Sequence, residues 1–229
     1  LKQLATSEVN VCTIEDPIEM VEPSFNQIQV HNSIDLTFAA GVKALLRQDP
    51  DIIMIGEIRD LHTAEMAIQA ALTGHLVLST LHTNDSPSAI TRLLELGVPA
   101  YLINATVLGV MAQRLVRTLC PNCKQPDELD PAVWESFSDG MDLELESPCK
   151  PVGCIECRQT GFLGRVGLYE MLEMTSSLKS RVKPDSDLES LRAQTQADGL
   201  LTLRYSGAKK VSQGLTTIEE VLRVTPFVA

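Results

Sequence analysis

No glycine in this chain of 229 residues is followed by lysine, so the Gly-x-x-x-x-Gly-Lys-Ser/Thr loop is missing. In P-loop enzymes that loop holds the phosphates of a nucleotide with its backbone N–H groups and its lysine. The sequence therefore excludes a complete phosphate-binding site of this kind. The chain also lacks an initiator methionine, and residues 1–6 have the character of a helix end. We expect it to be a fragment that begins just after such a loop.

Long apolar runs and an excess of basic residues are missing as well. No apolar run approaches the roughly 18–20 residues that a membrane-spanning helix needs, and no signal peptide is recognisable. Lysine and arginine number 19 against 30 acidic residues, which gives a net charge of −11. The short apolar runs lead us to expect no transmembrane segment. Since a general nucleic-acid surface needs clustered positive charge, we also expect no nucleic-acid partner.

The remaining composition is that of a folded globular chain. Hydrophobic residues make up 44% and charged residues 21%, which is enough apolar material for one large or two modest domains. Residues 127–147 hold eight acidic residues and no basic one, and so account for most of the net charge of −11. We interpret this acidic insert as a solvated loop, with a docking surface for a basic partner as the alternative.

Apolar periodicity divides the chain into strands and helices. Strands alternate with helices in the first half, and this alternation is typical of βαβ units and a parallel sheet. The character changes at residue 120, where Pro, Gly, Cys and acids become frequent. The predicted strands are 9–14, 52–55 and 76–80, with an irregular hairpin at 21–29, and the predicted helices are 36–46, 63–73, 86–96, 101–119, 131–137, 187–198, 200–208 and 218–224.

The stretch from Arg47 to Asp60 is the most informative part of the sequence. Its uninterrupted apolar run, residues 52–55, predicts a strand buried on both faces of a parallel sheet. Residues just after such a strand emerge at its carboxyl end, where open α/β sheets bind their ligands. Glu57 is therefore placed where a nucleotide-hydrolysing enzyme needs a carboxylate for Mg²⁺ and the attacking water.

Polar clusters follow three of the strand-like segments. They are Glu15-Asp16-x-x-Glu19, Glu57-x-x-Asp60 and His82-x-Asn84. Carboxylates at strand ends suit a phosphoryl-transfer site, and a nearby imidazole can stabilise a terminal phosphate. Any one cluster alone favours the simpler interpretation of helix caps on solvated loops. Three clusters on one sheet edge favour a catalytic site.

Five of the six cysteines lie between residues 120 and 157. Two Cys-x-x-Cys pairs can each present two thiolates to one tetrahedral Zn²⁺, and the acidic insert can loop out between them. The alternative is a set of reduced cysteines without a ligand. Cys149 is a spare that could replace one ligand, and Cys12 is predicted to be a core residue. The predicted zinc ligands are Cys120, Cys123, Cys154 and Cys157.

Three long stretches together resemble one known family. Residues 13–19, 46–60 and 73–84 look like the Asp box, Walker B motif and His box of the secretion ATPases that drive type II secretion and type IV pilus assembly. The resemblance runs in order over essentially the whole chain, including the cysteine region and the closing stretch 214–225. It implies that the Walker A loop and an N-terminal sensor domain would lie before Leu1.

The resemblance also implies a fold, a site and partners. The fold would be α/β: a truncated RecA-like P-loop NTPase core (1–119), a tetracysteine zinc subdomain (120–166) and a mostly helical C-terminal subdomain (167–229). The implied cofactors are ATP, Mg²⁺ and Zn²⁺. The parent would be a homo-hexamer, cytoplasmic and peripheral at the inner membrane, working with the cytoplasmic domains of membrane platform proteins. The implied catalytic residues are Glu57, Glu15, Asp16 and His82, and the implied nucleotide or Mg²⁺ site consists of Asp51, Glu57, Glu15, His75 and His82.

Two other functions remain open at this point. Because the phosphate loop is missing, the isolated chain could be a catalytically silent, zinc-dependent docking module. A RecA-type nucleic-acid motor is opposed by the net charge. Arg114 and Arg117 could reach a phosphate, although we favour structural pairing with acids. His31 and His62 show no partner pattern and are predicted to be surface or cap residues.

Overall fold

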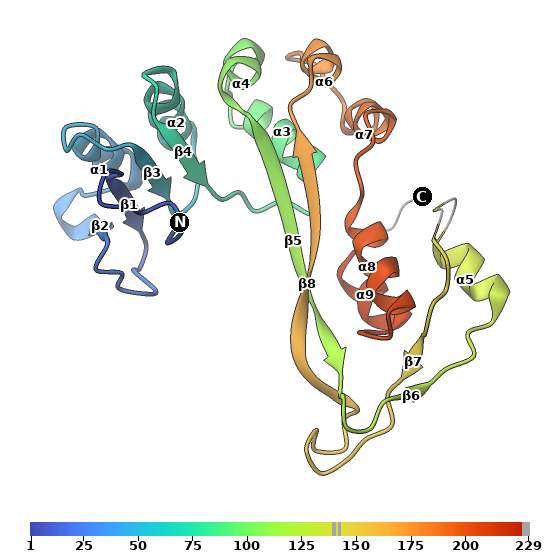
Figure 1. The fold of residues 1–229 in the computed structure, drawn as a ribbon. Helices are drawn as coiled ribbons and strands as arrows, with labels where there is room; N and C mark the ends of the chain where they lie inside the picture. The colour runs from blue at the N-terminus through green and yellow to red at the C-terminus, as the bar shows by residue number, and fades with distance from the viewer. Residues whose placement is uncertain (139–140, 142, 226–229) are drawn as a thin grey trace. The chain divides into compact units, whose positions relative to one another are not determined.

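The computed structural model describes residues 1–138, 141 and 143–225 (Figure 1). The chain forms two compact units. The units are Leu1–Thr83, Ala89–Leu108 and Lys179–Asp187 (unit 1), and Asn84–Ser88, Gly109–Leu178 and Leu188–Ala229 (unit 2). The predicted three-way division at residues 119 and 166 stays a prediction.

Unit 1 is built on a four-stranded parallel sheet. The strands are β1 (Val11–Glu15), β2 (Phe25–Gln29), β3 (Ile52–Ile55) and β4 (Leu76–Ser79), in the order β2-β1-β3-β4. Every neighbouring pair is parallel, so the carboxyl ends of all four strands lie at one edge of the sheet.

Two helices complete the core of this sheet. Helix α1 (Phe38–Leu45) and helix α2 (Leu61–Leu72) contribute Val42, Leu45 and small alanines to a cluster with the strand residues Ile14, Ile53 and Ile55. The three isoleucines are fully buried, as the uninterrupted apolar run in the sequence predicted for β3. The 3₁₀ turn η1 (Asn32–Ile34) precedes α1.

Three details of unit 1 differ from the sequence prediction. Residues 1–6 form turns and not the end of a helix, and β2 pairs in parallel with β1 where a hairpin was predicted. The apolar stretch 76–80 predicts a second buried strand, but Leu76 and Leu78 of β4 are 39% and 36% exposed. The reason is its position, because among the described strands β4 is at the end of the order and pairs with β3 alone.

The remaining helices of this half are α3 (Ser86–Glu95), α4 (Ala100–Thr106) and α6 (Ser176–Arg181). A glycine directly after the predicted helix 86–96 is expected to close it, and Gly97 does so with a positive φ of 97°. The predicted helix 101–119 is wrong beyond its first turns. From residue 109 the chain is a strand, because alternate residues, and not residues at helical spacing, are buried.

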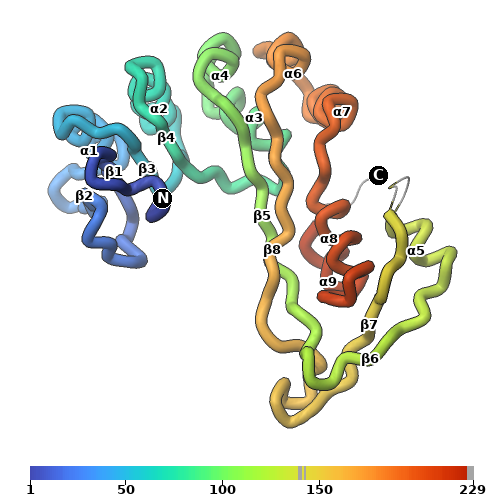
Figure 2. The backbone as a smooth tube through the Cα atoms, in the orientation of Figure 1, coloured from blue at the N-terminus to red at the C-terminus, as the bar shows by residue number. Residues whose placement is uncertain are grey.

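Unit 2 is organised around a long antiparallel pair, β5 (Gly109–Leu119) and β8 (Phe162–Glu173). Figure 2 shows the two strands side by side along their length. Helices α8 (Leu203–Ser212) and α9 (Ile218–Val224) pack on this pair, and Val116 and Leu168 form the strand side of their shared core. The smaller elements are β6 (Gln125–Pro126), α5 (Pro131–Ser138), β7 (Cys149–Lys150) and α7 (Leu188–Ala197).

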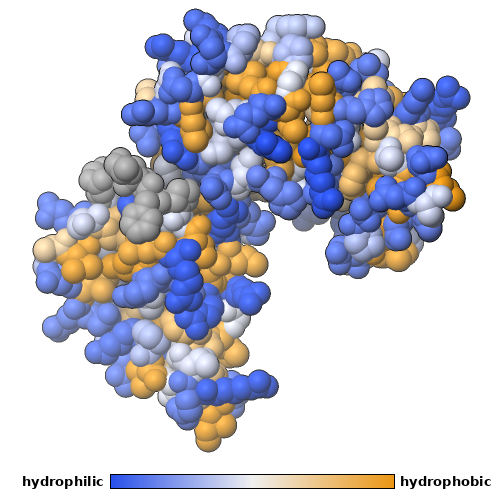
Figure 3. Space-filling model, turned by 180° about the vertical axis from the view of Figure 1, so that it is seen from behind, coloured by the Kyte–Doolittle hydropathy of each residue, from blue (hydrophilic) through white to orange (hydrophobic). Residues whose placement is uncertain are grey.

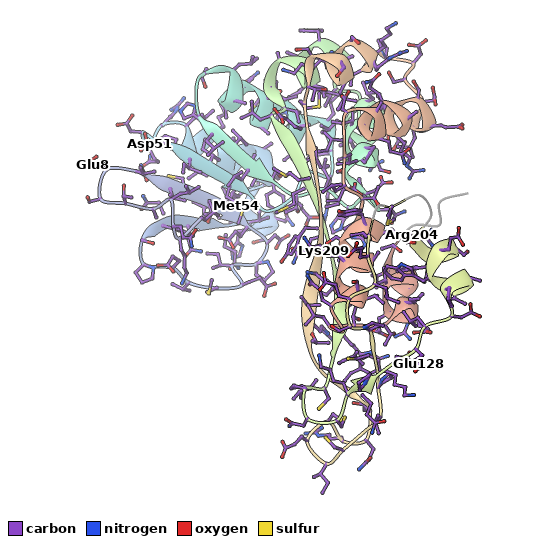
Figure 4. The ribbon with its side chains drawn as sticks, turned by 45° about the vertical axis from the view of Figure 1, so that its right-hand side comes forward. Glu8, Asp51, Met54, Glu128, Arg204 and Lys209 are labelled. Carbon is purple, nitrogen blue, oxygen red and sulfur yellow. The ribbon has the colours of Figure 1, made fainter. Side chains whose placement is uncertain are left out.

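The acidic insert is not simply a solvated loop. Its helix α5 places Trp134 and Phe137 in the core of unit 2, with 9% and 4% exposure. Arg204 of α8 lies over the ring of Phe137 at 5.8 Å (Figure 4). The insert is therefore anchored to α8 by aromatic packing, and the part of it at 139–140 and 142 lies outside the described residues.

Two buried carboxylates fix the start of α3 within unit 2. Glu170 of β8 accepts hydrogen bonds from the backbone N–H groups of Ser86 (2.8 Å) and Leu203 (3.0 Å). Asp85 accepts from the N–H of Ser88 at 3.0 Å and forms an ion pair with Arg192 of α7 at 2.5 Å. The pair Ser86-Pro87 in the sequence predicts a cap at Ser86, but Asp85, one residue earlier, does the capping.

Candidate functional site

The carboxyl edge of the unit 1 sheet is held together by hydrogen bonds between successive connections. The N–H of Gly56 donates to the carbonyl of Ile14 (2.8 Å), and the N–H of Ile58 donates to the carbonyl of Thr80 (3.0 Å). The hydroxyl of Thr80 donates to the carbonyl of Gly56 at 2.6 Å. The residues after β1, β3 and β4 therefore share one edge, as the three polar clusters predicted.

Gly56 allows this close approach. A Cβ atom at this position would lie 3.3 Å from the carbonyl oxygen of Ile14 and 3.3 Å from the ring of Phe38. A side chain at this position would require these neighbours to give way by a few tenths of an ångström. Glycine before Glu57 therefore lets the carboxylate leave the sheet directly beside the neighbouring strand.

Glu57 is the most constrained carboxylate at this edge. Its two oxygens pair with Arg59 at 2.5 Å and with Nε2 of His82 at 2.9 Å. Its side chain is 12% exposed, whereas those of Arg59 and His82 are 66% and 83% exposed. The Arg59 guanidinium lowers the pKa of Glu57 below its usual range, and His82 adds to this effect against the opposing effect of burial. Glu57 is thus a carboxylate held ionised next to an exposed imidazole.

Glu15 emerges from the neighbouring strand. One of its oxygens accepts from the hydroxyl of Thr13 at 2.5 Å and from Nε2 of Gln27 at 3.0 Å. These contacts orient the side chain, while Asp16 and Glu19 beyond it are exposed. Ionised or hydrogen-bonded carboxylate oxygens on adjacent strand ends are the donors that Mg²⁺ prefers, so these residues fit such an ion.

Two predicted site residues lie elsewhere. Asp51 precedes β3 and His75 precedes β4, so both are at the amino edge of the sheet, opposite Glu57. Asp51 accepts from the N–H of Asn10 at 2.7 Å, and Figure 4 labels it near Glu8, where the strands begin. His75 Nδ1 lies 2.9 Å from the carbonyl of Ala70. The structure does not bring Asp51 and His75 together with Glu57, because parallel strands keep their two ends apart.

Asp60 and Asn84, the last residues of two of the predicted polar clusters, make hydrogen bonds that fix the local fold. Asp60 caps α2 by accepting from the N–H and hydroxyl of Thr63, at 2.8 and 3.1 Å. The carbonyl of Asn84 accepts from Arg114 at 3.1 Å within unit 2. The simpler interpretation as caps and tethers therefore holds for these two residues, and Glu57, Glu15 and His82 remain as the candidate catalytic group.

Sequence reasoning missed Arg59. It lies two residues after Glu57, and a basic residue so close in sequence to the predicted carboxylate was a usable signal. The predicted structural pairing of Arg117 is confirmed by a bidentate ion pair with Glu220, with its Nη2 at 2.7 Å.

The four predicted zinc ligands form a second cluster, in unit 2. Their sulfur atoms all lie within 4.8 Å of one another. The separations are 3.8 Å for Cys120–Cys154, 3.9 Å for Cys123–Cys157 and 3.8 Å for Cys154–Cys157. Four sulfurs bound to one tetrahedral Zn²⁺ at 2.3 Å would be about 3.8 Å apart, so the cluster fits zinc in geometry as well as in donor type.

Backbone N–H groups point at the sulfurs of the cluster. Gly153 donates to Cys123 at 3.3 Å, and Cys154 and Gly161 donate to Cys157 at 3.2 Å each. Burial opposes ionisation of Cys157, but these two N–H groups and the neighbouring thiols outweigh it and lower its pKa to about 6. Burial is the main reason that the pKa of Cys123 rises to about 11. One thiolate is therefore stabilised before any metal binds.

The other two cysteines stand apart from this cluster. Cys149 donates to the carbonyl of Ser147 at 3.5 Å and is not among the four grouped thiols. Cys12 is fully buried in the unit 1 core, as predicted, and burial raises the pKa of its thiol. Cys149 therefore offers a natural control for any test of the metal site.

Comparison with known proteins identifies the family. A family model described as type II/IV secretion system protein matches residues 1–223. The chain belongs to this family. In the described residues, no helix combines the length and the hydropathy that crossing a membrane would require.

Relatives from both branches of the family are similar over almost all of the chain. The type IV pilus assembly ATPase TfpB of Acinetobacter baylyi is 58% identical over 228 residues, which are 99% of this chain and 39% of the relative. The type II secretion system protein E of Pectobacterium carotovorum is 47% identical over 225 residues, 98% of this chain and 44% of the relative. The type II secretion system ATPase E of Vibrio cholerae is 45% identical with the same coverage. The chain thus spans less than half of the length of these relatives.

Solved structures agree with the predicted fold class. The crystal structure of the pilus retraction motor PilT with bound ADP matches 99% of this chain and 55% of that chain, with a TM-score of 0.67 and 26% identity. The Legionella pneumophila ATPase DotB matches with a TM-score of 0.65 at 24% identity, which supports the fold alone. The α/β prediction of a RecA-like parallel sheet flanked by helices, with a four-cysteine cluster and C-terminal helices, is confirmed.

Proposed function

We propose that this chain forms the water- and metal-positioning part of an ATP-hydrolysing motor for type II secretion or type IV pilus assembly. The observation that carries the proposal is the ionised Glu57 paired with His82 at 2.9 Å, at the carboxyl edge of a parallel sheet. Membership of the family and the names of the relatives support the same activity.

Each residue of the group has a proposed role. Glu57 would hold Mg²⁺ or the attacking water, and Glu15 on the next strand would supply a second carboxylate for the same purpose. Asp16 follows Glu15 and would take part through bound water. His82 would stabilise charge that develops on the terminal phosphate, and its high exposure leaves the imidazole accessible to a nucleotide. The bound ATP and Mg²⁺ would supply the reacting phosphoryl group and its charge neutralisation.

The zinc cluster and the partners complete the proposal. Cys120, Cys123, Cys154 and Cys157 would hold one structural Zn²⁺ that ties the start of β8 to the end of β5. The parent protein would be a cytoplasmic homo-hexamer, peripheral at the inner membrane, acting on the cytoplasmic domains of membrane platform proteins. The hexamer, its location and the platform partners rest on the family and on no contact within this chain.

A second candidate is a catalytically silent docking module built around the zinc cluster. The absence of a Gly-x-x-x-x-Gly-Lys-Ser/Thr loop from the sequence favours it for the isolated chain. A nucleic-acid motor is disfavoured by the net charge of −11, and an ATPase assay with and without DNA would separate the two motors.

The decisive experiment changes Glu57→Gln in the parent protein and measures ATP turnover and nucleotide binding separately. Since the amide keeps the shape but not the charge, we expect turnover to fall by at least about 100-fold while binding is retained. His82→Ala should reduce turnover more than binding, because its proposed partner is charge that forms during transfer.

Glu65→Gln is the matched control, since Glu65 is exposed on α2 and its one ion pair among the described residues is with His62, at 3.9 Å. It should leave both quantities unchanged. Near-parental turnover of the Glu57→Gln protein at saturating Mg²⁺ would reduce Glu57 to a structural residue and leave the docking module as the better function.

A further inference from the structure

His82, the candidate catalytic imidazole, projects from the surface of unit 1. Its side chain is 83% exposed, and its Nε2 lies 2.9 Å from the carboxylate of Glu57. A catalytic group has to be held within about 0.5 Å of its working position. Since so exposed a side chain is not fixed by packing, the position of the imidazole depends on the backbone that carries it.

That backbone is a short segment with an anchor at each end. Thr80 fixes the first end in unit 1, because its carbonyl accepts from the N–H of Ile58 at 3.0 Å. The chain passes from unit 1 into unit 2 between Thr83 and Asn84. Residues 81–83, here named the strap, can span at most about 14 Å between the flanking Cα atoms. A connection this short cannot absorb a large displacement of either end.

The second end of the strap is anchored wholly within unit 2. Arg192 of α7 donates to the carboxylate of Asp85 through Nε and Nη2, at 3.0 and 2.5 Å. The N–H of Ser86 donates to the carboxylate of Glu170 on β8 at 2.8 Å. Side chains from two separate elements of unit 2 therefore hold the residues that follow the strap.

The anchoring carboxylates lie where charged groups are seldom found. Strongly hydrophilic residues, drawn in blue, cover much of the visible surface in Figure 3, as is usual for charged side chains. Asp85 and Glu170 are only 6% and 4% exposed. Burying a carboxylate costs free energy unless the group is paired, and a helix cap needs only one such side chain. Helix α3 therefore begins with one more buried carboxylate than its cap requires.

We propose that Arg192, Asp85 and Glu170 are positioning residues that act on ATP hydrolysis through His82. They fix the far end of the strap, so that the imidazole meets the carboxylate of Glu57 with a defined geometry. A misplacement of about 1 Å can lower turnover by about 100-fold. The inference rests on the proposed function of the Glu57 and His82 pair, and it makes residues of unit 2 necessary for the chemistry of unit 1.

The test is a double-mutant cycle in the parent protein, in which ATP turnover and MgATP binding are measured separately. Arg192→Gln removes the ion pair with Asp85, and the arginine side chain is 42% exposed, so its replacement leaves no large cavity. We expect turnover to fall by about tenfold while binding is unchanged. In the His82→Ala background the same substitution should have no further effect, because the group through which it acts is gone.

Two further substitutions control for charge and for a general loss of stability. Arg192→Lys keeps the positive charge beside Asp85 and should retain most of the turnover. Arg181→Gln is the matched control, since Arg181 is exposed on α6 and belongs to none of the ion pairs among the described residues. It should behave like the parent in both backgrounds.

A second variant leaves every anchoring side chain in place. Two glycines inserted between Thr83 and Asn84 lengthen the strap by about 7 Å, while the contacts beyond it can still form. Turnover should fall by about tenfold or more, and MgATP binding and the melting temperature should be retained. The same insertion between Ser186 and Asp187, in the connection from α6 to α7, should leave turnover unchanged.

The outcomes separate this inference from the proposed function. Equal losses from Arg192→Gln in the parental and His82→Ala backgrounds would overturn the inference alone, because the ion pair would then act on stability and not through the imidazole. Parental turnover after lengthening of the strap would overturn it as well. Parental turnover of the His82→Ala protein would overturn both the proposed role of His82 and the inference that rests on it.

Discussion

The side chain of Glu220 forms ion pairs with arginines, although its sequence context predicts a helix cap. The sequence around Thr217 predicts a capping box, and Thr217 does accept from the N–H of Glu220, at a long 3.5 Å. The carboxylate of Glu220 instead binds Arg117 on β5 and Arg223 on α9, at 2.7 and 2.8 Å. Arg117 also stacks over the ring of Phe162 at 4.1 Å. The residue thus connects α9 to the base of the β5–β8 pair.

This contact predicts a pH-dependent stability difference. Arg117 holds the pKa of Glu220 below its ordinary value of 4.5. A carboxylate with a lowered pKa stabilises the folded state above its ordinary pKa, and this contribution is lost as the pH falls through the lowered pKa. We expect Glu220→Gln to reduce the free energy of unfolding by about 1–2 kcal/mol at pH 7. The expected loss is modest because both arginines are partly exposed, and solvent screens their charges. The difference between the two proteins should shrink as the pH falls through the lowered pKa of Glu220.

Chemical denaturation of both proteins at each pH measures this difference, so that changes common to both cancel. Glu219→Gln is the control, because Glu219 is the exposed neighbour on the same helix. A difference that stays constant from pH 7 down to the acid range in which carboxylates are protonated would mean that the carboxylate charge is not what stabilises α9.

At the scale of elements, the sequence did not identify the strands β5 and β8, each of which buries side chains on one face only. Strand β8 buries Leu168, Glu170 and Leu172 on one side, and the charged Glu170 interrupts the apolar alternation. The role of Glu170 is visible only in the structure, where its carboxylate accepts hydrogen bonds from the first N–H groups of α3 and α8. Strand β5 exposes Met111 and Leu115 at 62% and 50%. Because apolar residues lie on both of its faces, their spacing in the sequence resembles that of a helix. Elements with a buried apolar run or a clear cap, such as β3 and α2, were predicted closely.

The metal-binding turns give the prediction that belongs to this scale. Purified under reducing conditions, the chain should contain about one Zn²⁺, and Cys120→Ser should lose it and loosen residues 120–166. The parallel sheet of unit 1 should stay folded, because its core is formed without any residue of this segment. Elemental analysis and amide hydrogen exchange measure the two effects.

Cys149→Ser provides the comparison for this change. Cys149 lies near the cluster in sequence but outside the four grouped thiols, so its replacement should leave the zinc content intact. Zinc lost equally from both variants would make Cys149 a ligand, and no stoichiometric zinc in the unmodified chain would remove the metal site.

At the scale of the molecule, the motifs predicted which strand ends meet, and the fold decided which side chains reach them. Glu57 and His82 were predicted to share an edge, and the parallel register brings them into contact. Asp51 and His75 belong to the same motifs, yet strand direction sends them to the opposite edge. The residues of a motif therefore do not show by themselves at which end of the strand each side chain lies.

The sequence also predicts a property of the isolated chain as a whole. Most phosphate contacts in such enzymes come from a loop that these 229 residues do not contain. The isolated chain should therefore bind MgATP weakly or not at all, whereas the parent protein should bind it. Titration calorimetry on both proteins makes the comparison, and micromolar affinity of the isolated chain would refute the argument.

Strand β4 has a practical consequence for anyone who prepares this chain. Within the described residues its only sheet neighbour is β3, so one row of its backbone N–H and C=O groups has no strand beside it. Leu76 and Leu78 on this open border are more than one third exposed. Such a border is a template on which a strand from another molecule can add, and concentrated solutions should form strand-rich aggregates that bind thioflavin. A single gatekeeper charge, Leu78→Lys, should delay that aggregation and raise the soluble yield.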